Sequence, residues 1–249
     1  MKNGYRAFAT DYDGTIATHG RVDEPTLAAL RRVRDAGVRL ILVSGRELES
    51  LARTFSEFEI FDMMVLENGA LLYEPPSRRE RVLCDPPPER LITRLRERGV
   101  HPVSVGRVIV ATFEPHEVEV LEAIRDLGLE HQVIFNKGAV MVLPAGVNKA
   151  TGLREALGDM GITPDETVGV GDAENDHAFL ELCGVGAAVA NALPSLKAHA
   201  DVTLMRDHGA GVIELCDQLL AGTLHPRVEP VPKPELHRLS DNVDVVPDE

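Results

Sequence analysis

The sequence has few aromatic residues, few cysteines and no long hydrophobic run. Aromatic residues make up 4% of its 249 residues and tryptophan is absent, so the hydrophobic core must be mainly aliphatic. The three cysteines are scattered and show no metal-ligand spacing, which indicates reduced thiols in the cytoplasm and not a disulfide framework. No apolar run reaches the roughly 18 residues of a membrane span, and no signal-peptide pattern is present, so we expect a cytoplasmic protein without membrane contact.

Positive charge is also scarce. Forty acidic residues face 26 basic ones, which gives a formal net charge of -14. Such a charge repels nucleic acids and anionic membranes, so neither is expected as a partner. A phosphate group can approach this chain only where local positive charge overrides the overall field. The length allows one large or two modest domains with a real core.

Two carboxylates at the end of the first predicted strand are the strongest local signal. A short apolar run leads to Asp11 and Asp13, and Gly14 follows. In an extended chain the two acids face the same side, and glycine permits the turn that ends the strand. This arrangement suits a hard cation beside a phosphate, but an ordinary acidic turn is equally compatible with these residues alone. An EF-hand calcium loop is excluded because glycine stands fourth from Asp11 and not sixth.

Predicted strands and helices alternate before and after a central segment, residues 71–143, that shows another pattern of elements. After the opening strand, the predicted strands of the alternating parts are 38–43, 63–66, 167–170, 185–189 and 202–204. Alternation predicts an α/β fold, a Rossmann-like parallel sheet core over residues 1–70 and 144–222, whose binding crevice lies at the carboxyl ends of the strands. Residues 71–143 predict an inserted α+β cap domain with an antiparallel sheet. The proline-rich, acidic residues 223–249 predict a disordered tail.

Residues with catalytic or binding potential recur at the ends of these strands. In chain order they are Asp11 with Asp13, then Ser44-Gly45-Arg46, then Lys149 before a helix, and finally Asp172 with Asn175 and Asp176. Each group alone is compatible with an ordinary role as a helix cap, a solvent-exposed lysine or an acidic loop. The ordered set, in which every member follows a strand or opens a helix, favours one shared site.

With these motifs the sequence resembles the haloacid dehalogenase superfamily of phosphatases, in the Cof-type branch (subfamily IIB) with a cap after the third strand. Residues 11–15 match its first motif, 44–46 the second, 148–149 the third and 171–176 the fourth. Residues 68–70 and 189–192 also resemble that branch. The short cap makes the sequence similar to archaeal-type phosphoglycolate phosphatases and to small sugar-phosphate phosphatases.

The resemblance implies Mg²⁺-dependent hydrolysis of a small phosphorylated metabolite, a sugar phosphate or a phosphoglycolate-like phosphomonoester, through an aspartyl-phosphate intermediate. It implies Asp11 as the nucleophile and Asp13 as the general acid and base. The implied Mg²⁺ ligands are Asp11, the backbone carbonyl of Asp13, Asp172, and Asp176 directly or through water. The implied phosphate-binding groups are Ser44, Gly45, Lys149, Asn175 and a backbone N–H near Tyr12.

Two other functions remain open from the sequence. A phosphomutase of the phosphomannomutase type shares the first motif and the cap position, and a non-catalytic phosphate-responsive binding module is the third hypothesis. The retention of both first-motif acids argues against the binding module. Arg46 is interpreted as a structural cation, and Asn136-Lys137-Gly138 as a hairpin turn. The chain is expected to be a monomer or a homodimer.

Overall fold

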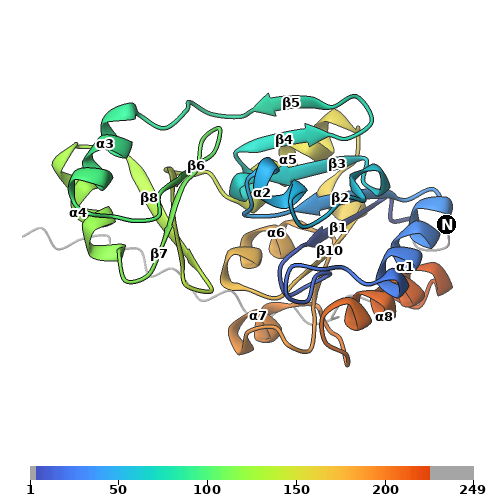
Figure 1. Cartoon of the computed structure of the whole chain (residues 1–249). Coiled ribbons are helices and arrows are strands. Elements are labelled where there is room, and N and C mark those ends of the chain that lie inside the picture. The colour runs from blue at the N-terminus through green and yellow to red at the C-terminus, as the bar shows by residue number, and fades with distance from the viewer. Residues whose placement is uncertain (1–3, 225–249) are drawn as a thin grey trace, which may run out of the picture.

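The computed structural model describes residues 4–224, so the predicted tail lies, from residue 225 onward, outside the described residues. The described chain forms a larger α/β body and a smaller body inserted into it (Figure 1). No helix among residues 4–224 combines the length and the apolar composition needed to cross a membrane.

The larger body is built on an eight-stranded sheet with the order β12-β11-β10-β1-β2-β3-β4-β5. Its parallel strands are β1 (Ala7–Asp11), β2 (Arg39–Val43), β3 (Met63–Leu66), β10 (Thr167–Gly171), β11 (Val185–Ala188) and β12 (Val202–Thr203). Two antiparallel strands, β4 (Leu71–Glu74) and β5 (Arg79–Val82), complete one edge. β1 lies between β10 and β2, so the first-motif acids stand near the middle of the sheet.

Helices cover both faces of this sheet (Figure 1). α1 (Glu24–Asp35) packs against α8 (His208–Ala221), and α5 (Lys149–Asp159) packs against α6 (His177–Leu182). The shorter helices are α2 (Leu48–Ala52), α7 (Pro194–His199), η1 (Phe58–Ile60), η2 (Glu67–Gly69), η3 (Pro164–Glu166) and η4 (Glu174–Asp176). The start of α1 follows from its sequence, because the Asp23 side chain accepts from the backbone N–H of Thr26 at 2.9 Å and a proline opens the first turn.

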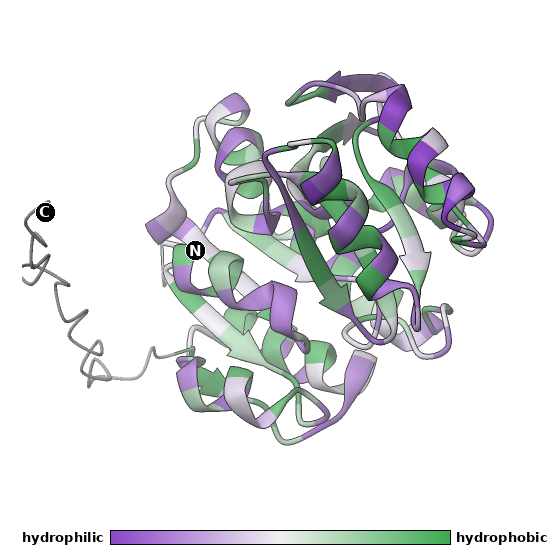
Figure 2. Ribbon diagram, turned by 90° about the vertical axis from the view of Figure 1, so that its left-hand side faces the viewer, coloured by the Kyte–Doolittle hydropathy of each residue, from purple (hydrophilic) through white to green (hydrophobic). Residues whose placement is uncertain are grey.

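Parallel strands covered on both faces are buried along their length and therefore hydrophobic at most positions. Every residue of β1, β3, β10 and β11 is buried. Figure 2 shows the same segregation, with hydrophobic residues on the inner strands and hydrophilic residues on the outer parts of the helices. The core is mainly aliphatic, as the low aromatic content predicts.

The smaller body is an antiparallel sheet with two helices. Its strands, in the order β6-β7-β9-β8, are β6 (Ser104–Val105), β7 (Val110–Phe113), β9 (Ala139–Pro144) and β8 (His131–Asn136). The helices α3 (Glu89–Glu97) and α4 (Glu117–Asp126) pack together on the outer side, and the sheet faces the larger body (Figure 1). It has its own hydrophobic core, formed by residues such as Leu91, Val120 and Val142.

The predicted α/β core with an α+β insert is confirmed, with one correction. Residues 71–82, which the sequence analysis assigned to the cap, form β4 and β5 and extend the large sheet. Leu71 and Leu72 are buried in the larger hydrophobic core, and a chain that reverses after β3 pairs most easily with β3 itself. The remaining domain boundaries stay a prediction.

Candidate functional site

The carboxyl ends of four neighbouring strands form one edge of the large sheet. Asp172 follows β10, Asp11 ends β1, Ser44 follows β2 and Glu67 follows β3. The sheet order β10-β1-β2-β3 therefore places in one row residues that are up to 161 positions apart in the sequence, the separation of Asp11 and Asp172. This is the place where α/β sheets of this kind bind ligands.

A buried lysine joins two buried carboxylates at the centre of this row. The Lys149 Nζ atom lies 2.6 Å from Asp11 Oδ1 and 2.6 Å from Asp176 Oδ1. The side chains of Lys149, Asp11 and Asp176 are only 1%, 6% and 0% exposed. The ammonium also lies 5.7 Å from the centre of the Phe179 ring. Lys149 therefore neutralises charge in a place that water hardly reaches.

The start of α5 brings Lys149 to this position. Asn148 caps the helix, since its side chain accepts from the backbone N–H of Thr151 at 3.0 Å and Thr151 Oγ1 accepts from the backbone N–H of Asn148 at 3.0 Å. The helix can approach β3 and η2 closely because glycines meet there: a Cβ atom on Gly152 would lie 2.5 Å from the Cα of Gly69. Lys149, the first residue of the helix, therefore reaches Asp11.

Asp176 and Asp172 are held in fixed orientations. Asp176 Oδ2 accepts from the backbone N–H groups of Asp172 and Ala173, both at 2.8 Å. Asp172 Oδ1 accepts from the hydroxyl of Thr15 at 3.2 Å. Because Asp176 uses one oxygen for Lys149 and the other for the loop backbone, its carboxylate orders the loop that carries Asp172.

Burial and like charges perturb the acids of this group. Burial raises the pKa of Asp11 to about 7; Lys149 opposes this rise, and the nearby Asp176 and Asp172 add to it. The pKa of Asp172 is also raised by burial. Burial alone would lower the pKa of Lys149, but its two carboxylate partners outweigh that effect and raise it. The site therefore favours any further cation that neutralises its carboxylates.

The residues present fit a divalent metal ion. One oxygen from each of Asp11, Asp172 and Asp176 lies within 4.8 Å of the others. Carboxylate and carbonyl oxygens are the ligands that Mg²⁺ prefers. A side-chain cation lies at the expected metal position in this structure. The ammonium of Lys137 lies 2.6 Å from the carbonyl oxygen of Asp13 and 2.8 Å from Asp172 Oδ2.

The Asp13 carboxylate lies outside this buried group. Arg46 donates to both of its oxygens, Nε to Oδ2 at 2.6 Å and the terminal Nη2 to Oδ1 at 2.8 Å. The guanidinium carbon lies 5.4 Å from the centre of the Tyr12 ring. The Tyr12 ring itself points away from the acids, since its hydroxyl donates to the carbonyl of Gly20 at 2.9 Å. A role of Tyr12 at the site is therefore confined to its backbone.

The remaining predicted phosphate-binding residues lie beside this group. Ser44 is buried, and its hydroxyl oxygen accepts from the backbone N–H of Arg46 at 3.2 Å. Gly45 packs against Asn68, whose Oδ1 would lie 3.1 Å from a Cβ atom placed on the glycine. Asn175 Nδ2 donates to Asn68 Oδ1 at 2.9 Å. Among residues 4–224, the buried Asn175 Oδ1 finds no hydrogen-bond partner, so it is available to a ligand.

A cavity of about 340 Å³ opens between the two bodies at this point. Its walls come from the cap strand β8 and from the start of α6 with η4, and they include Lys149, Asn175, Ile134 and Phe135. Its volume suits a small metabolite. Lys149 and Asn175 connect the cavity directly to the carboxylate group.

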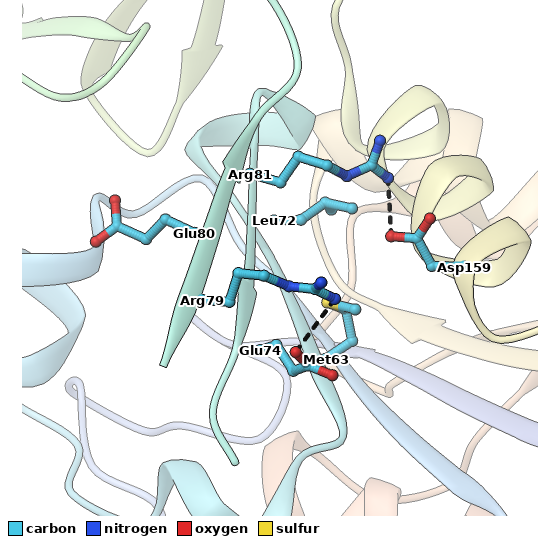
Figure 3. A pocket seen from close by; sticks show the side chains of 7 residues that line it. All are labelled: Met63, Leu72, Glu74, Arg79, Glu80, Arg81 and Asp159. Atoms are coloured by element: carbon cyan, nitrogen blue, oxygen red, sulfur yellow. Dashed lines mark hydrogen bonds and ion pairs between the residues drawn. The ribbon is translucent and has the colours of Figure 1, made fainter. Parts of the chain in front are cut away.

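A larger hollow of about 410 Å³ lies at the other end of the sheet (Figure 3). Its walls carry two ion pairs, Arg79 with Glu74 at 3.3 Å and Arg81 with Asp159 at 2.9 Å. Asp159 is the last residue of α5 and Lys149 the first, so about 15 Å of helix separates this hollow from the buried lysine. The hollow is not part of the carboxylate site.

Sequence reasoning missed several contacts of this site. The predicted hairpin turn at Asn136-Lys137-Gly138 is confirmed, but the turn alone did not predict that the Lys137 ammonium reaches Asp13 and Asp172. Gly14 follows Asp13 in the sequence and lies beside Asp172 and Lys137. Its carbonyl oxygen accepts hydrogen bonds from Asn191 Nδ2 at 2.8 Å and from His208 Nδ1 at 2.9 Å. For the contacts of Lys137 and His208 the sequence carries no local signal, whereas Asn191 lies in residues 189–192, a segment that resembles the Cof-type branch.

A profile of the haloacid dehalogenase-like hydrolase family matches residues 8–95 and 104–215. The phosphoglycolate phosphatase of Methanothermobacter thermautotrophicus is 34% identical over 220 residues, covering 84% of this chain and 96% of that protein. The phosphoglycolate phosphatase of Sulfolobus acidocaldarius is 30% identical over 230 residues, covering 88% and 99%. Among solved structures, a sugar phosphatase of HAD subclass IIB superposes with a TM-score of 0.71 at 18% identity, covering 88% of this chain and 100% of that one.

Proposed function

The chain belongs to the haloacid dehalogenase-like hydrolase family, and we propose that it is a Mg²⁺-dependent phosphatase that hydrolyses a small phosphomonoester through an aspartyl phosphate. One observation carries this proposal: Asp11, Asp172, Asp176 and Lys149 converge from three separate parts of the chain into one buried group. A purely structural ion pair between Lys149 and its two carboxylates has no need of a third buried carboxylate, Asp172, beside it.

Asp11 is the proposed nucleophile. Lys149 holds Asp11 Oδ1 at 2.6 Å, so the direction of the carboxylate is fixed before substrate arrives. Its other oxygen attacks phosphorus, the bond from phosphorus to the ester oxygen breaks, and the electron pair leaves with that oxygen. Lys149 also neutralises the phosphoryl oxygens that approach Asp11, because a phosphate ester otherwise repels a carboxylate.

Asp13 is the proposed acid and base. It gives a proton to the leaving oxygen and later takes one from the water that attacks the aspartyl phosphate, which returns the electron pair to Asp11. In the structure Arg46 donates to both oxygens of Asp13 and holds that carboxylate apart from the nucleophile. The proposed acid role therefore requires the Asp13 side chain to turn from Arg46 toward the leaving oxygen. Two acids one residue apart thus receive different roles from different surroundings.

The proposed Mg²⁺ ligands are Asp11, the carbonyl of Asp13 and Asp172, and the ion would supply positive charge shared by nucleophile and phosphoryl group. Asp176 holds Lys149 and the loop of Asp172 with its two oxygens, so its proposed contact with the ion is through water and not direct. Ser44, the backbone of Gly45 and of Tyr12, and the free Oδ1 of Asn175 are the proposed contacts to phosphate and substrate.

The cavity and the relatives support the proposed substrate class. A cavity of about 340 Å³ admits a small organic phosphate. Two relatives at 34% and 30% identity are named phosphoglycolate phosphatases. We therefore propose phosphoglycolate as the first substrate to test and small sugar phosphates as the second group.

The test is phosphate release by the full chain from phosphoglycolate, from small sugar phosphates and from an aryl phosphate. We expect release that needs Mg²⁺, is abolished by a chelator and is lost in Asp11→Asn. Phosphate transfer that depends on a bisphosphate activator, with little release, would instead identify a phosphomutase. Tight binding of these compounds without turnover would contradict both.

A further inference from the structure

The tip of the cap hairpin carries a lysine into the proposed metal site. Lys137 stands between β8 and β9, and its backbone has a φ of 51°. Its side chain is 49% exposed, but the ammonium donates to the carbonyl of Asp13 at 2.6 Å and to Asp172 Oδ2 at 2.8 Å. Residues 124 positions apart in the sequence thus meet at the proposed metal site.

The path of this side chain depends on a glycine. A Cβ atom on Gly14 would lie 2.4 Å from Lys137 Nζ and 2.3 Å from Asp172 Oδ2, so only glycine leaves room for the contact. Gly14 also has a φ of 91°, which other residues rarely adopt. The hairpin tip therefore approaches Asp172 closely, and the contact joins the Lys137 ammonium to the Asp172 carboxylate.

Lys137 binds the same two oxygens that a divalent ion would use. An ammonium neutralises Asp172 as a metal ion does, but the two cations repel each other strongly at contact distance. We propose that Lys137 competes with the divalent ion for Asp13 and Asp172, so that metal binding displaces the ammonium and releases the hairpin tip from the catalytic centre. This inference rests on the metal site of the proposed function.

The cap keeps a second, independent attachment when the tip is released. Glu67 is buried, and its carboxylate accepts from the backbone N–H groups of Arg107, Val108 and Ile109 at 2.8, 2.8 and 2.9 Å. The Arg107 side chain adds ion pairs to Glu49 at 2.7 Å and to Glu80 at 2.8 Å. The hairpin can therefore move about this anchor while the cap stays attached.

Release of the tip affects substrate access directly. β8 ends at Asn136, next to Lys137, and residues 133–135 of the same strand line the cavity beside Lys149 and Asn175. A shift of the tip thus widens the entrance to that cavity. In the metal-free protein Lys137 neutralises Asp172 and holds the hairpin tip on the catalytic centre; in the metal-bound protein the tip is released and the entrance widens.

The test measures metal affinity, not activity. The titration uses the full-length protein without substrate, with Mg²⁺ added in a calorimeter. Lys137→Gln is expected to bind Mg²⁺ about tenfold or more tightly than the unmodified protein, because one competing charge is gone. Arg125→Gln is the matched control: it removes one cap cation, 72% exposed and paired with Asp126 on α4, and should leave the affinity unchanged.

Hydrogen exchange gives a second readout. Added Mg²⁺ should lower the protection of residues 131–144 in the unmodified protein and in Arg125→Gln, but should change it little in Lys137→Gln. Equal or weaker Mg²⁺ affinity in Lys137→Gln, or greater protection of the hairpin on adding Mg²⁺, would overturn the proposal. Mg²⁺ binding with this pattern but no phosphatase activity would refute the proposed function alone, whereas activity with unchanged affinity in Lys137→Gln would refute this inference alone. Failure of the unmodified protein to bind Mg²⁺ would overturn both.

Discussion

Replacement of Lys149 by methionine should destabilise the protein strongly, and more at high pH than at low pH. Lys149 lies 2.6 Å from each of two buried carboxylates. At an effective dielectric constant of about 20, each contact has a gross Coulomb energy of roughly 6 kcal/mol, most of which offsets the cost of burying the ammonium. Removing one partner of such a group costs about 3–5 kcal/mol, because the remaining charges stay buried without compensation.

The pH dependence follows from Asp11. Its pKa is already raised to about 7, and Lys149 is the group that opposes the rise, so Lys149→Met raises it further. A carboxyl whose folded-state pKa is raised contributes stability that is present at low pH and is lost as the pH rises through that pKa. The loss of stability in Lys149→Met should therefore be largest near about pH 8 and clearly smaller near about pH 5.5, where Asp11 takes up a proton.

The assay is urea unfolding with a chelator present, at both pH values. Lys197→Met is the matched control, because Lys197 is a partly buried lysine that donates to the carbonyl of Ala190 at 2.9 Å and contacts no described acid. It should cost about 1 kcal/mol at both pH values. Adding Asp11→Asn to Lys149→Met should restore part of the stability, since one uncompensated charge is removed. A Lys149→Met protein as stable as the unmodified one, or equally destabilised at both pH values, would refute the reasoning.

Two further predictions concern the metal and the helix that carries Lys149. The rise in melting temperature on adding Mg²⁺ should be larger at about pH 8 than at about pH 6, because protons compete with the metal for Asp11 and Asp172, whose pKa values are both raised; equal rises would contradict the metal site. Gly152→Ala should lower stability by about 1–3 kcal/mol, since the added Cβ would lie 2.5 Å from the Cα of Gly69, and should lower kcat by moving Lys149. Gly158→Ala on the same helix meets nothing within 4 Å and should raise stability by about 0.5–1 kcal/mol, so unfolding curves in which both variants behave alike would argue against the close approach at Gly152.

The large sheet and the central residues of the site could be predicted from the sequence because both follow local rules. Strands that alternate with helices pair in parallel, and their carboxyl ends share one edge. Asp11, Ser44 and Asp172 each follow a buried apolar run, so their meeting needs only the strand order. Predicting the place of Lys149 requires one further inference, namely that a capped helix begins at that edge of the sheet.

The cap contacts could not be predicted in this way. Lys137 stands in an ordinary turn sequence, and only the placement of the whole insert over the core brings its ammonium to Asp172. The partners of Glu67 are backbone groups of a loop about forty residues later, which leave no pattern in the sequence. The place of residues 71–82 could not be predicted because β5 is largely polar and exposed along its whole length, so no hydrophobic pattern marks it as an edge strand of the large sheet.

The most direct test of the account is to find the covalent intermediate on Asp11. The protein is mixed with a phosphomonoester in the presence of Mg²⁺, quenched rapidly in acid and digested with trypsin, which cleaves after Arg6 and Arg21. We predict that the peptide of residues 7–21 carries one phosphoryl group in the unmodified protein and none in Asp11→Asn. Phosphate release by an enzyme whose residues 7–21 are never phosphorylated, or a phosphoryl group on any other residue, would contradict the central claim.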